Sequence, residues 1–595
     1  MSVADSPVPV DGTHSAVRIF ISDRTTSNPV LRELTAVVVF VGLLGVAPGL
    51  VTADTGTGNA TGAGLESQAG QSVPGPEIVE LYPDPTTEGD RGEFVTVSLP
   101  PGTNLTDYEL GDQQVTVSLS PTAVNRTDAN VTDTTLDTAE PAARRVTFST
   151  DPGLTGWLTD RTVAPLSDSL ELANGGETVT LRRDGEAVDS AGYDQATEGE
   201  VYNTTTGGWE SLGATDRPVV TAGPGTVEAF VLPDEPDRAV EFLDSATERV
   251  LLAGYTVSSQ RVVEALVAAL ERGVTVEVLA DGSPVGGITG EGVAALSELD
   301  RSGATVRVLA GERERFRYHH PKYAVVDDRA LVTTENWKQS GTGGGSNRGW
   351  AVITGQAPIV EGLVETFRAD LNWVDTVPWR RHDPDPVEDT SVAGDYPQTF
   401  EARDLPVNRT QLLVAPDNAG ERIRAVIEGA EESVLVKQVG IGGRGFSLLQ
   451  AVLDAAKRGV EVRILLSSAW YVEEENRQLA AWLTDQAAAA DLPLSARLAA
   501  PGDAFGKIHA KGLVVDGEHT LVGSVNWNEN SVRNNREVAL LLSGQAVGGY
   551  FTEVFEADWQ AGDGGERSIP LGIGLAVLAG AVLALLGAKR IRFDS

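Results

Sequence analysis

Histidine and lysine are scarce in this 595-residue chain, yet they occur together twice in the same short pattern. The chain has only six histidines, and its first lysine is residue 322. The pattern is His-x-Lys, then four residues, then Asp, and it comprises His320, Lys322 and Asp327 in one place and His509, Lys511 and Asp516 in another. Two copies of such an improbable combination indicate one shared site rather than coincidence.

Two His–Lys pairs that face each other suit the cleavage of a phosphodiester. The reaction needs a nucleophile, an acid for the leaving alkoxide, and positive charge around the phosphoryl oxygens. One imidazole attacks phosphorus to give a phosphohistidine, the other protonates the leaving group, and the lysines hold the oxygens. A carboxylate bonded to an imidazole N–H fixes its tautomer, which is the predicted role of Asp327 and Asp516. Each aspartate serves either its own histidine or that of the other copy.

Polar residues that follow each motif are predicted to bind the substrate phosphate: Thr334 and Asn336 in the first copy, and Ser524 and Asn526 in the second. Residues two apart on a strand point to the same face, so Ser524 and Asn526 share a face on the strand that follows the second motif. We predict no cofactor and no metal ion, because the sequence contains no His-x-x-x-His pair and no cysteine cluster.

The motifs belong to an internal repeat of α/β type. In the first copy, strand patterns at 248–255 and 274–279 flank helical spacing over 262–272, and the second copy repeats the order at 432–436, 448–458 and 459–465. Each copy ends in a further helical stretch, with Phe367-Arg-Ala-Asp370 matching Phe555-Glu-Ala-Asp558. Strands that alternate with helices predict a sheet with much parallel pairing and helices on both faces.

These residues resemble the phospholipase D superfamily over roughly 219–559. The resemblance implies two αβα-sandwich domains, a phosphohistidine intermediate, His320 as nucleophile and His509 as acid. It also implies a supporting role for Glu537, which follows Asn535-Arg536 in the second copy. The first copy departs from this pattern, because Thr333-Thr334 stands where Gly523-Ser524 does and Gly349 stands where Glu537 does. The missing carboxylate is expected to weaken that half of the site.

Residues 76–209 have short alternating runs between turn residues, which predict an all-β sandwich. Runs such as Glu77-Ile-Val-Glu-Leu and Leu172-Ala-Asn-Gly-Gly-Glu-Thr-Val-Thr-Leu resemble a lamin-tail domain, which implies an immunoglobulin-like fold. We find no catalytic constellation in this segment. Adhesion or presentation is its expected role.

Two hydrophobic stretches predict membrane topology. Residues 34–51 precede Val51-Thr52-Ala53, so residues 1–53 are either a cleaved signal peptide or an anchor. Residues 569–588 carry no charge and are long enough for a transmembrane helix, and the basic residues just after them favour a cytoplasmic tail at 589–595. The sequence therefore predicts a protein of the cell membrane with the bulk of the chain outside the cell.

The chain is strongly acidic, with 85 Asp and Glu against 46 Lys and Arg and a formal charge of −39. Such self-repulsion destabilises a compact state in dilute buffer but is screened in molar salt. We therefore expect a halophilic protein, as from a haloarchaeon, and an ordinary acidic secreted protein is the alternative.

The predicted domains are a leader (1–53), a linker (54–74), the lamin-tail-like sandwich (75–210), phospholipase D-like domains at 219–376 and 405–562 joined by a linker (377–404), the transmembrane helix (569–588) and the tail (589–595). The leading hypothesis is a phosphodiesterase that hydrolyses or transfers phospholipid head groups. An extracellular metal-independent nuclease is an alternative, since the superfamily contains such enzymes. A non-catalytic surface protein is another. With both motifs in one chain, a monomer can hold a complete site.

Overall fold

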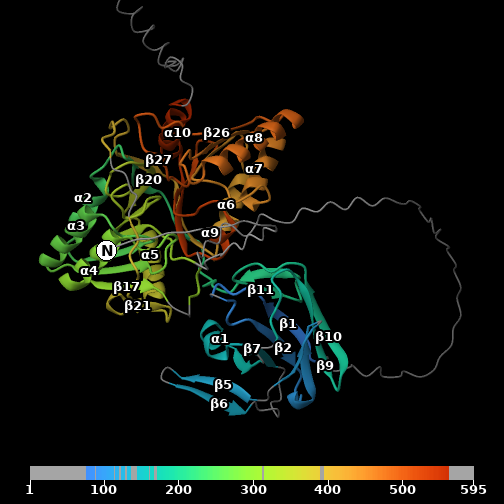
Figure 1. Ribbon diagram of the computed structural model, residues 1–595. Helices are drawn as coiled ribbons and strands as arrows, with labels where there is room; N and C mark the ends of the chain where they lie inside the picture. Colours follow the sequence, from blue (N-terminus) through green and yellow to red (C-terminus); the bar gives the residue numbers. More distant parts are fainter. Residues whose placement is uncertain are drawn as a thin grey trace, which may run out of the picture. The chain divides into compact units, whose positions relative to one another are not determined.

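The computed structural model describes residues 75–561, apart from gaps at 88, 113, 120–121, 128–129, 136–143, 160, 167–169, 311–313 and 389–393. Figure 1 colours the first β-rich segment blue to teal, the first repeat green to yellow, and the second orange to red. The predicted leader, the 54–74 linker, the transmembrane segment and the tail lie outside the described residues.

The first segment consists of two β-sheets that share one core. An eight-stranded sheet has the order β12-β11-β1-β2-β7-β8-β5-β6, and a four-stranded sheet has the order β10-β9-β3-β4. One cluster of buried side chains draws on both sheets, which is the packing expected of a sandwich. The elements are β1 (Glu77–Tyr82), β2 (Phe94–Leu99), β3 (Tyr108–Gly111), β4 (Thr116–Ser118), β5 (Thr122–Thr127), β6 (Asn130–Thr135), β7 (Arg144–Ser149), α1 (Pro152–Leu158), β8 (Thr162–Pro165), β9 (Glu177–Arg183), β10 (Glu186–Tyr193), β11 (Glu200–Asn203) and β12 (Gly208–Ser211).

The first repeat forms a mixed sheet in which β15, β16 and β17 are parallel and their neighbours are antiparallel. Gly273 ends α3 in the left-handed conformation (φ 86°), which a residue without a Cβ adopts at little cost. The elements are β13 (Val220–Ala222), β14 (Gly225–Leu232), α2 (Arg238–Asp244), β15 (Arg249–Gly254), α3 (Gln260–Glu271), β16 (Thr275–Asp281), α4 (Gly290–Ser302), β17 (Thr305–Leu309), β18 (Tyr323–Val326), β19 (Arg329–Thr333), β20 (Asn347–Thr354), α5 (Ala357–Leu371) and β21 (Thr376–Pro378).

The second repeat reproduces this plan, and Gly459 (φ 97°) ends α7 as Gly273 ends α3. Its elements are β22 (Arg403–Val407), β23 (Arg409–Ala415), α6 (Ala419–Glu428), β24 (Ser433–Gln438), α7 (Ser447–Lys457), β25 (Glu461–Leu466), α8 (Glu473–Ala490), β26 (Leu494–Leu498), β27 (Lys507–Ile508), β28 (Gly512–Val515), β29 (His519–Gly523), α9 (Glu529–Arg533), β30 (Glu537–Ser543) and α10 (Gln545–Gln560).

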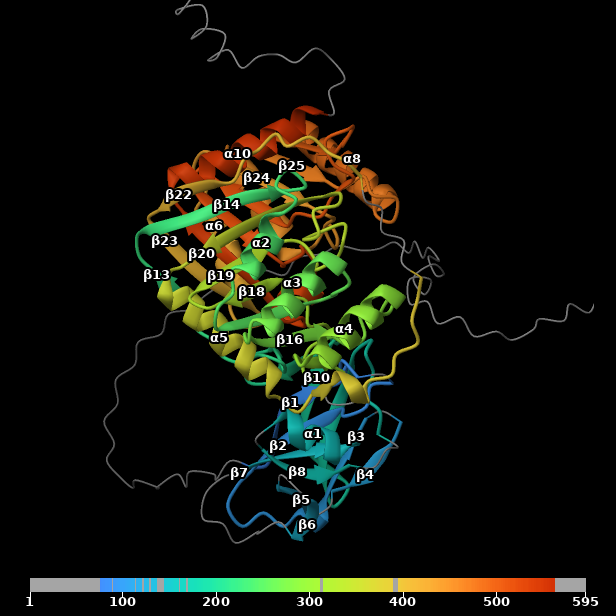
Figure 2. The ribbon, with the colours of Figure 1, turned by 90° about the vertical axis from the view of Figure 1, so that its left-hand side faces the viewer.

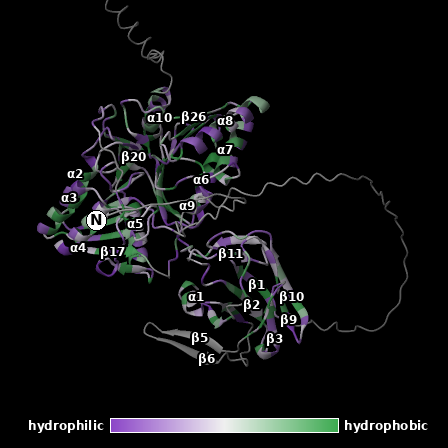
Figure 3. Cartoon of the chain, in the orientation of Figure 1, coloured by the Kyte–Doolittle hydropathy of each residue, from purple (hydrophilic) through white to green (hydrophobic). Residues whose placement is uncertain are grey.

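The two repeats are interlocked around a shared core. One buried cluster contains side chains from both sheets together with α5 and α10, while separate clusters pack α2–α4 and α6–α8 on the outer faces. Strands also cross between the repeats: β13 joins the sheet of the second repeat, and β27 pairs with β20 of the first. Figure 2 shows the outer helices α2, α3 and α4 of the first repeat. In Figure 3, hydrophilic and hydrophobic residues alternate along such helices, as one-sided burial requires.

The predicted fold class needs one correction. None of the helices in the described part of the chain is long and apolar enough to cross a membrane. The longest of them, α8, has 18 residues and begins with three glutamates, whereas a span needs about 20 apolar residues. The described fold is a β-rich segment followed by mixed α/β sheets. The C-terminal transmembrane helix that the predicted fold class included is not supported. The lamin-tail resemblance and the extracellular location stay predictions.

Candidate active site

Each His–Lys pair lies just before the first strand of a β-hairpin, and that strand is central in its sheet. His320 and Lys322 precede β18, and His509 and Lys511 precede β28. Because the two residues of a pair share a face, each lysine Nζ reaches its own histidine: Lys322 lies 3.0 Å from Nε2 of His320, and Lys511 lies 3.2 Å from Nε2 of His509. All four side chains are largely buried. Rigid strands thus hold both pairs.

The two pairs meet across the boundary between the repeats. The backbone N–H of His320 donates to the carbonyl of Arg536 (3.0 Å), and that of His509 donates to the carbonyl of Arg348 (3.1 Å), so each histidine is attached to the other repeat. The charge of Lys511 acts on His320, and the charge of Lys322 acts on His509. One chain therefore assembles a site with approximate two-fold symmetry.

A buried glutamate contacts the inner nitrogen of each imidazole. Glu537 of the second repeat lies 2.8 Å from Nδ1 of His320, and Glu335 of the first repeat lies 3.2 Å from Nδ1 of His509. Both carboxylates are 0% exposed. A carboxylate on Nδ1 keeps the proton there and leaves Nε2 free to react. Glu537 was predicted from the sequence to support the site, whereas Glu335 was not, and the expectation that the first repeat lacks a carboxylate is wrong.

The aspartates of the two motifs do not bond to the imidazoles, so the predicted orienting role is wrong. The Asp327 carboxylate accepts hydrogen bonds of 2.8–2.9 Å from the backbone N–H groups of residues 247–249 and from the Thr247 hydroxyl. Asp516 accepts from the backbone N–H groups of residues 431–433. Both adopt a left-handed conformation with φ 54° at the hairpin turn, at the opposite end of the strand from the lysine. They clamp the start of β15 and β24.

Burial sets the protonation of the four central groups. Desolvation lowers the pKa of His320 to about 4 and that of His509 to about 3, although the glutamates oppose it. Burial also lowers the pKa of Lys511 to about 8, and burial together with the charge of Lys511 lowers the pKa of Lys322 well below its usual value. The imidazoles are therefore neutral near pH 7, as a nucleophile requires.

The predicted phosphate-binding residues fall into two groups. The hydroxyls of Thr334 and Ser524 bond to the backbone of the neighbouring strand, Thr334 to Trp350 N–H (2.9 Å) and Ser524 to Val538 N–H (3.0 Å). They hold β19 to β20 and β29 to β30. Asn336 is different, because its Oδ1 is buried without a hydrogen-bond partner in the described structure and the residue lines the pocket beside His509. Asn526, at the matching position of the second repeat, is partly buried.

A pocket of about 510 Å³ lies beside His509. Its lining is mostly polar and includes two further lysines and two aromatic residues that face solvent: Trp470 is 87% exposed and Tyr471 41%. The lining residues are Asn336, Lys338, Ser340, Ser346, Asn347, Tyr396, Ser468, Ala469, Trp470, Tyr471, Gly506, Lys507 and His509. Four of the seven lysines in the chain thus belong to the two pairs or to this pocket.

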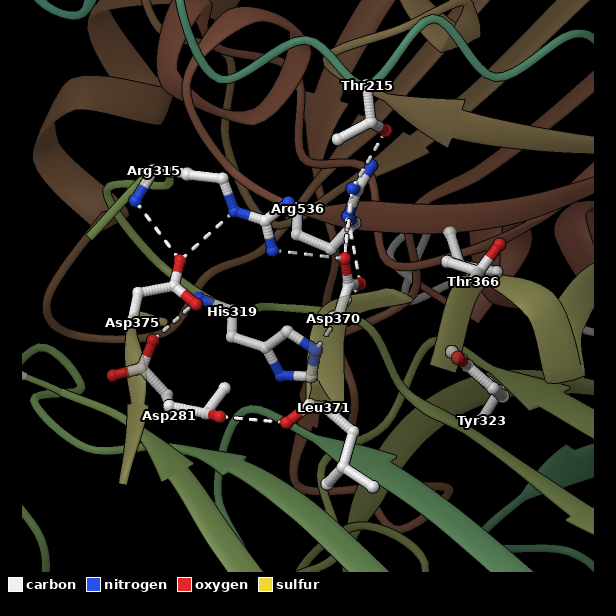
Figure 4. A network of polar contacts seen from close by, with 12 residues as sticks. Thr215, Asp281, Arg315, His319, Tyr323, Thr366, Asp370, Leu371, Asp375 and Arg536 are labelled. Carbon is white, nitrogen blue, oxygen red and sulfur yellow. Dashed lines mark hydrogen bonds and ion pairs between the residues drawn. The ribbon is translucent and has the colours of Figure 1, made fainter. Parts of the chain in front are cut away.

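Two buried arginines connect the two repeats next to the site through ion pairs. Arg536 forms ion pairs of 3.0 Å with Asp417 of its own repeat and with Asp370 on α5 of the other repeat (Figure 4). Arg348 forms the equivalent ion pairs in the first repeat, with Asp234 of its own repeat and with Asp558 on α10 of the second repeat. Asp370 and Asp558 end the matching Phe-x-Ala-Asp stretches of the sequence. These pairs hold the carbonyls that anchor His320 and His509.

His319 belongs to this support and not to the reacting groups. Its ring is 1% exposed and lies 4.0 Å from Asp370, and its backbone N–H donates to Asp281 (2.6 Å; Figure 4). Among the described residues, no group of three or more His, Asp or Glu side chains is arranged to hold a metal ion.

Fold and site together define a duplicated α/β domain in which each copy contributes one histidine to a shared site. Residues 239–371 and 423–559 match the family described as "Cardiolipin synthase, PLD-like domain". The chain therefore contains two phospholipase D-like domains, as the sequence predicted. The match extends to the domain family and leaves the activity and the substrate open.

Two curated relatives show what these domains are similar to. The chain is 33% identical over 119 residues to a mitochondrial cardiolipin hydrolase of Xenopus tropicalis, covering 20% of the chain and 50% of the relative. It is 27% identical over 127 residues to the DISARM protein DrmC of Bacillus paralicheniformis, covering 21% and 50%. The chain thus spans about half the length of these curated relatives.

Solved structures also match. Phosphatidylserine synthase of Haemophilus influenzae has a TM-score of 0.44 at 14% identity, covering 62% of this chain and 95% of that one. Nuc of Salmonella typhimurium, a phospholipase D family member, has a TM-score of 0.23 at 20% identity, covering 28% and 99%.

Proposed function

We propose that this protein is a phosphodiesterase that cleaves phospholipids, by hydrolysis or by transfer to another alcohol, through a phosphohistidine intermediate. One observation carries the proposal: two His–Lys pairs from two repeats meet, a buried carboxylate contacts Nδ1 of each imidazole, and a pocket lies beside His509. This set supplies a nucleophile, an acid and positive charge for the phosphoryl oxygens.

In the first step, Nε2 of His320 attacks phosphorus, the P–N bond forms, and the bond from phosphorus to the head-group oxygen breaks. His509 gives its proton to the departing oxygen, so the head group leaves as an alcohol. We assign His509 as the acid because it, and not His320, lines the polar pocket that suits a departing head group. The negative charge of the bound phosphodiester raises the pKa of His509, which lets the imidazole carry that proton.

In the second step, His509 removes a proton from water or from an acceptor alcohol, whose oxygen attacks the phosphohistidine. The new P–O bond forms, the P–N bond breaks, and His320 is released. Lys322 and Lys511 neutralise the phosphoryl oxygens in both steps. Both side chains are buried, and the low local dielectric strengthens the attraction between each ammonium and the phosphoryl oxygens.

The pocket favours a phospholipid. Its hydroxyl and amide side chains suit a small polar head group, with Ser340, Ser346 and Asn347 as examples. Trp470 and Tyr471 expose aromatic surface at the same pocket, where amphipathic rings suit the boundary between head groups and acyl chains.

A nuclease is the second candidate, and the same aromatic residues favour it. Nζ of Lys507 lies 5.0 Å from the ring centre of Tyr471, and an aromatic ring beside a lysine can stack a base while the ammonium contacts a backbone phosphate. The acidic chain argues against polyanion binding at low salt, where repulsion is strongest.

The test compares phospholipid in mixed micelles with single-stranded DNA, using the full chain in detergent with EDTA at low and molar salt. We expect phospholipid turnover that survives EDTA and is lost in His320→Ala and His509→Ala. His519→Ala is the matched control, because His519 lies at the far end of the β28–β29 hairpin and contacts Ser543. Acid quenching followed by mass spectrometry should find the phosphoryl adduct on His320. Faster turnover of DNA would favour the nuclease, and no turnover by the folded protein would refute both.

A further inference from the structure

The carboxylates that contact the two histidines come from opposite strands of their hairpins. Glu537 is the first residue of β30, the second strand of the β29–β30 hairpin. The equivalent hairpin of the first repeat is β19–β20, and there Glu335 directly follows the first strand, β19. The register gives the match: Thr333 pairs with Ala351 and Gly523 pairs with Ala539. Gly349 is therefore equivalent to Glu537, and Glu335 is equivalent to Val525.

Glu335 and Gly349 are direct cross-strand neighbours. The backbone N–H of Thr334 donates to the carbonyl of Trp350 (2.9 Å), which extends the β19–β20 ladder by one pair and places residue 335 opposite residue 349. Ser524 and Val538 make the same bond (2.9 Å) in the second repeat, which places Val525 opposite Glu537. Directly opposite side chains in a ladder are close enough to fill the same space.

The missing side chain of Gly349 makes room for the Glu335 carboxylate. A Cβ built on Gly349 would lie 2.3 Å from Cγ and 2.5 Å from Oε1 of Glu335, closer than any real Cβ contact. The first repeat thus carries Glu and Gly across the ladder, where the second carries Val and Glu. The two repeats therefore supply the acid from opposite strands of the hairpin.

The asparagine that holds the carboxylate has stayed in place. Asn535 Nδ2 donates to Glu537 (3.1 Å), and Asn347 Nδ2 donates to Glu335 (2.9 Å). Both asparagines lie two residues before the position at which the second repeat has its glutamate. The equivalent asparagines therefore hold carboxylates that come from opposite strands. Burial alone would raise the pKa of Glu335, but His509, Lys511 and Asn347 outweigh it and keep the pKa below its usual value.

We infer that Glu335 is the positioning residue of His509, and that it replaces, from the opposite strand, the acid that Gly349 lacks. The inference deepens the proposed function. Nδ1 of His509 faces two acceptors, Glu335 (3.2 Å) and the Thr334 carbonyl (3.1 Å), and Nζ of Lys511 lies 3.1 Å from the same nitrogen. The two acceptors favour a proton on Nδ1, which leaves Nε2 for the phosphate. Glu335 acts through His509 and does not itself react.

The test moves the carboxylate back to the symmetrical position. Glu335→Val should lower kcat by about 100-fold or more, because loss of an orienting carboxylate costs general acid–base catalysis at least that much. Gly349→Glu alone should be less stable because the two side chains collide. The double variant, Glu335→Val with Gly349→Glu, copies the pair found at Val525 and Glu537 and should recover most of the lost kcat.

Two readouts separate positioning from a merely structural effect. Without the carboxylate the His509 imidazolium loses its stabilising charge, so the limb of the kcat profile that reports loss of the His509 proton, the alkaline limb of the first step, should move to lower pH in Glu335→Val and return in the double variant. Val525→Ala, which reduces side-chain bulk at the matching position of the second repeat, should keep the wild-type limb. Wild-type turnover that depends on His320 and His509 but is unchanged in folded Glu335→Val would overturn the inference and leave the proposed function standing. A folded double variant no faster than the single one would also overturn it.

Discussion

The aspartate of each His-x-Lys-x4-Asp motif should be dispensable for catalysis and required for stability. Asp327 offers the clearer test, because its carboxylate accepts four hydrogen bonds from residues 247–249 and its backbone is left-handed, with φ 54°. Three substitutions separate these contributions. Asn tolerates the left-handed conformation and keeps one acceptor oxygen, Gly keeps only the conformation, and Ala keeps neither.

The magnitudes follow from these two contributions. A left-handed conformation costs alanine about 1–2 kcal/mol, and a carboxylate that caps backbone N–H groups contributes about 1–2 kcal/mol. Asp327→Ala should therefore lower the free energy of unfolding by about 2–4 kcal/mol, Asp327→Gly by about 1–2 kcal/mol, and Asp327→Asn by about 1 kcal/mol or less. All three should keep kcat near the wild-type value, because the carboxylate bonds to the turn and not to His320.

Denaturant unfolding and phospholipid turnover, measured on the same samples, check this. Partial burial raises the pKa of Asp327, but its hydrogen bonds outweigh this and keep the pKa below its usual value. The stabilisation is therefore present above the unfolded-state pKa and is lost as pH falls through the folded-state pKa, so wild type and Asp327→Asn should converge in acid. Folded Asp327 variants as inactive as His320→Ala would refute the reasoning.

Three further predictions concern the lysines, the buried arginines and the mouth of the pocket. Because burial lowers the pKa of Lys511 to about 8, its ammonium loses its proton above that pH, so kcat/KM should fall there; Lys511→Arg should lack this limb, and an unchanged limb would contradict the assignment. Arg536→Met removes the ion pair of buried Asp417 and leaves buried Asp370 only the more distant Arg315 (3.7 Å), so it should lower the free energy of unfolding by about 3–5 kcal/mol in a denaturant titration, and a loss under 1 kcal/mol would contradict this role of Arg536. Trp470→Ala should raise KM for phospholipid while kcat and Tm stay unchanged; an unchanged KM would remove Trp470 from the substrate path.

Much of the fold could be predicted because local patterns determine it. The alternation of strands, helices and left-handed glycines repeats at matching residues, such as Gly273 and Gly459, and these patterns predict α/β repeats without knowledge of tertiary contacts. The exchange of strands between repeats could not be predicted in this way. β13 and β27 are short and pair with the other repeat's sheet, so their partners depend on packing that no local period reports.

The site was predictable as far as spacing along one strand allows. His320 and Lys322 share a face because they are two residues apart, and the structure brings them together. Asp327 lies on the same short element, but the turn reverses the chain there, so the motif contains a residue that faces away from the chemistry. Glu335 could not be predicted from equivalent positions alone, because its counterpart in the second repeat is Val525. A signal existed: Glu335 and Gly349 differ from Val525 and Glu537 in complementary ways, and the hairpin register makes each pair neighbours.

The crossed arginines have a consequence for how such a site can diverge. Arg348 and Arg536 each form an ion pair with an aspartate of the other repeat. Each repeat therefore always packs against the other repeat of its own chain, whose sequence differs from its own. In a dimer of identical subunits, any substitution appears on both sides of the axis at once. Covalent fusion removes that restriction. One half can carry its acid on one strand and the other half on the opposite strand, and two histidines that began as copies are free to specialise as nucleophile and acid.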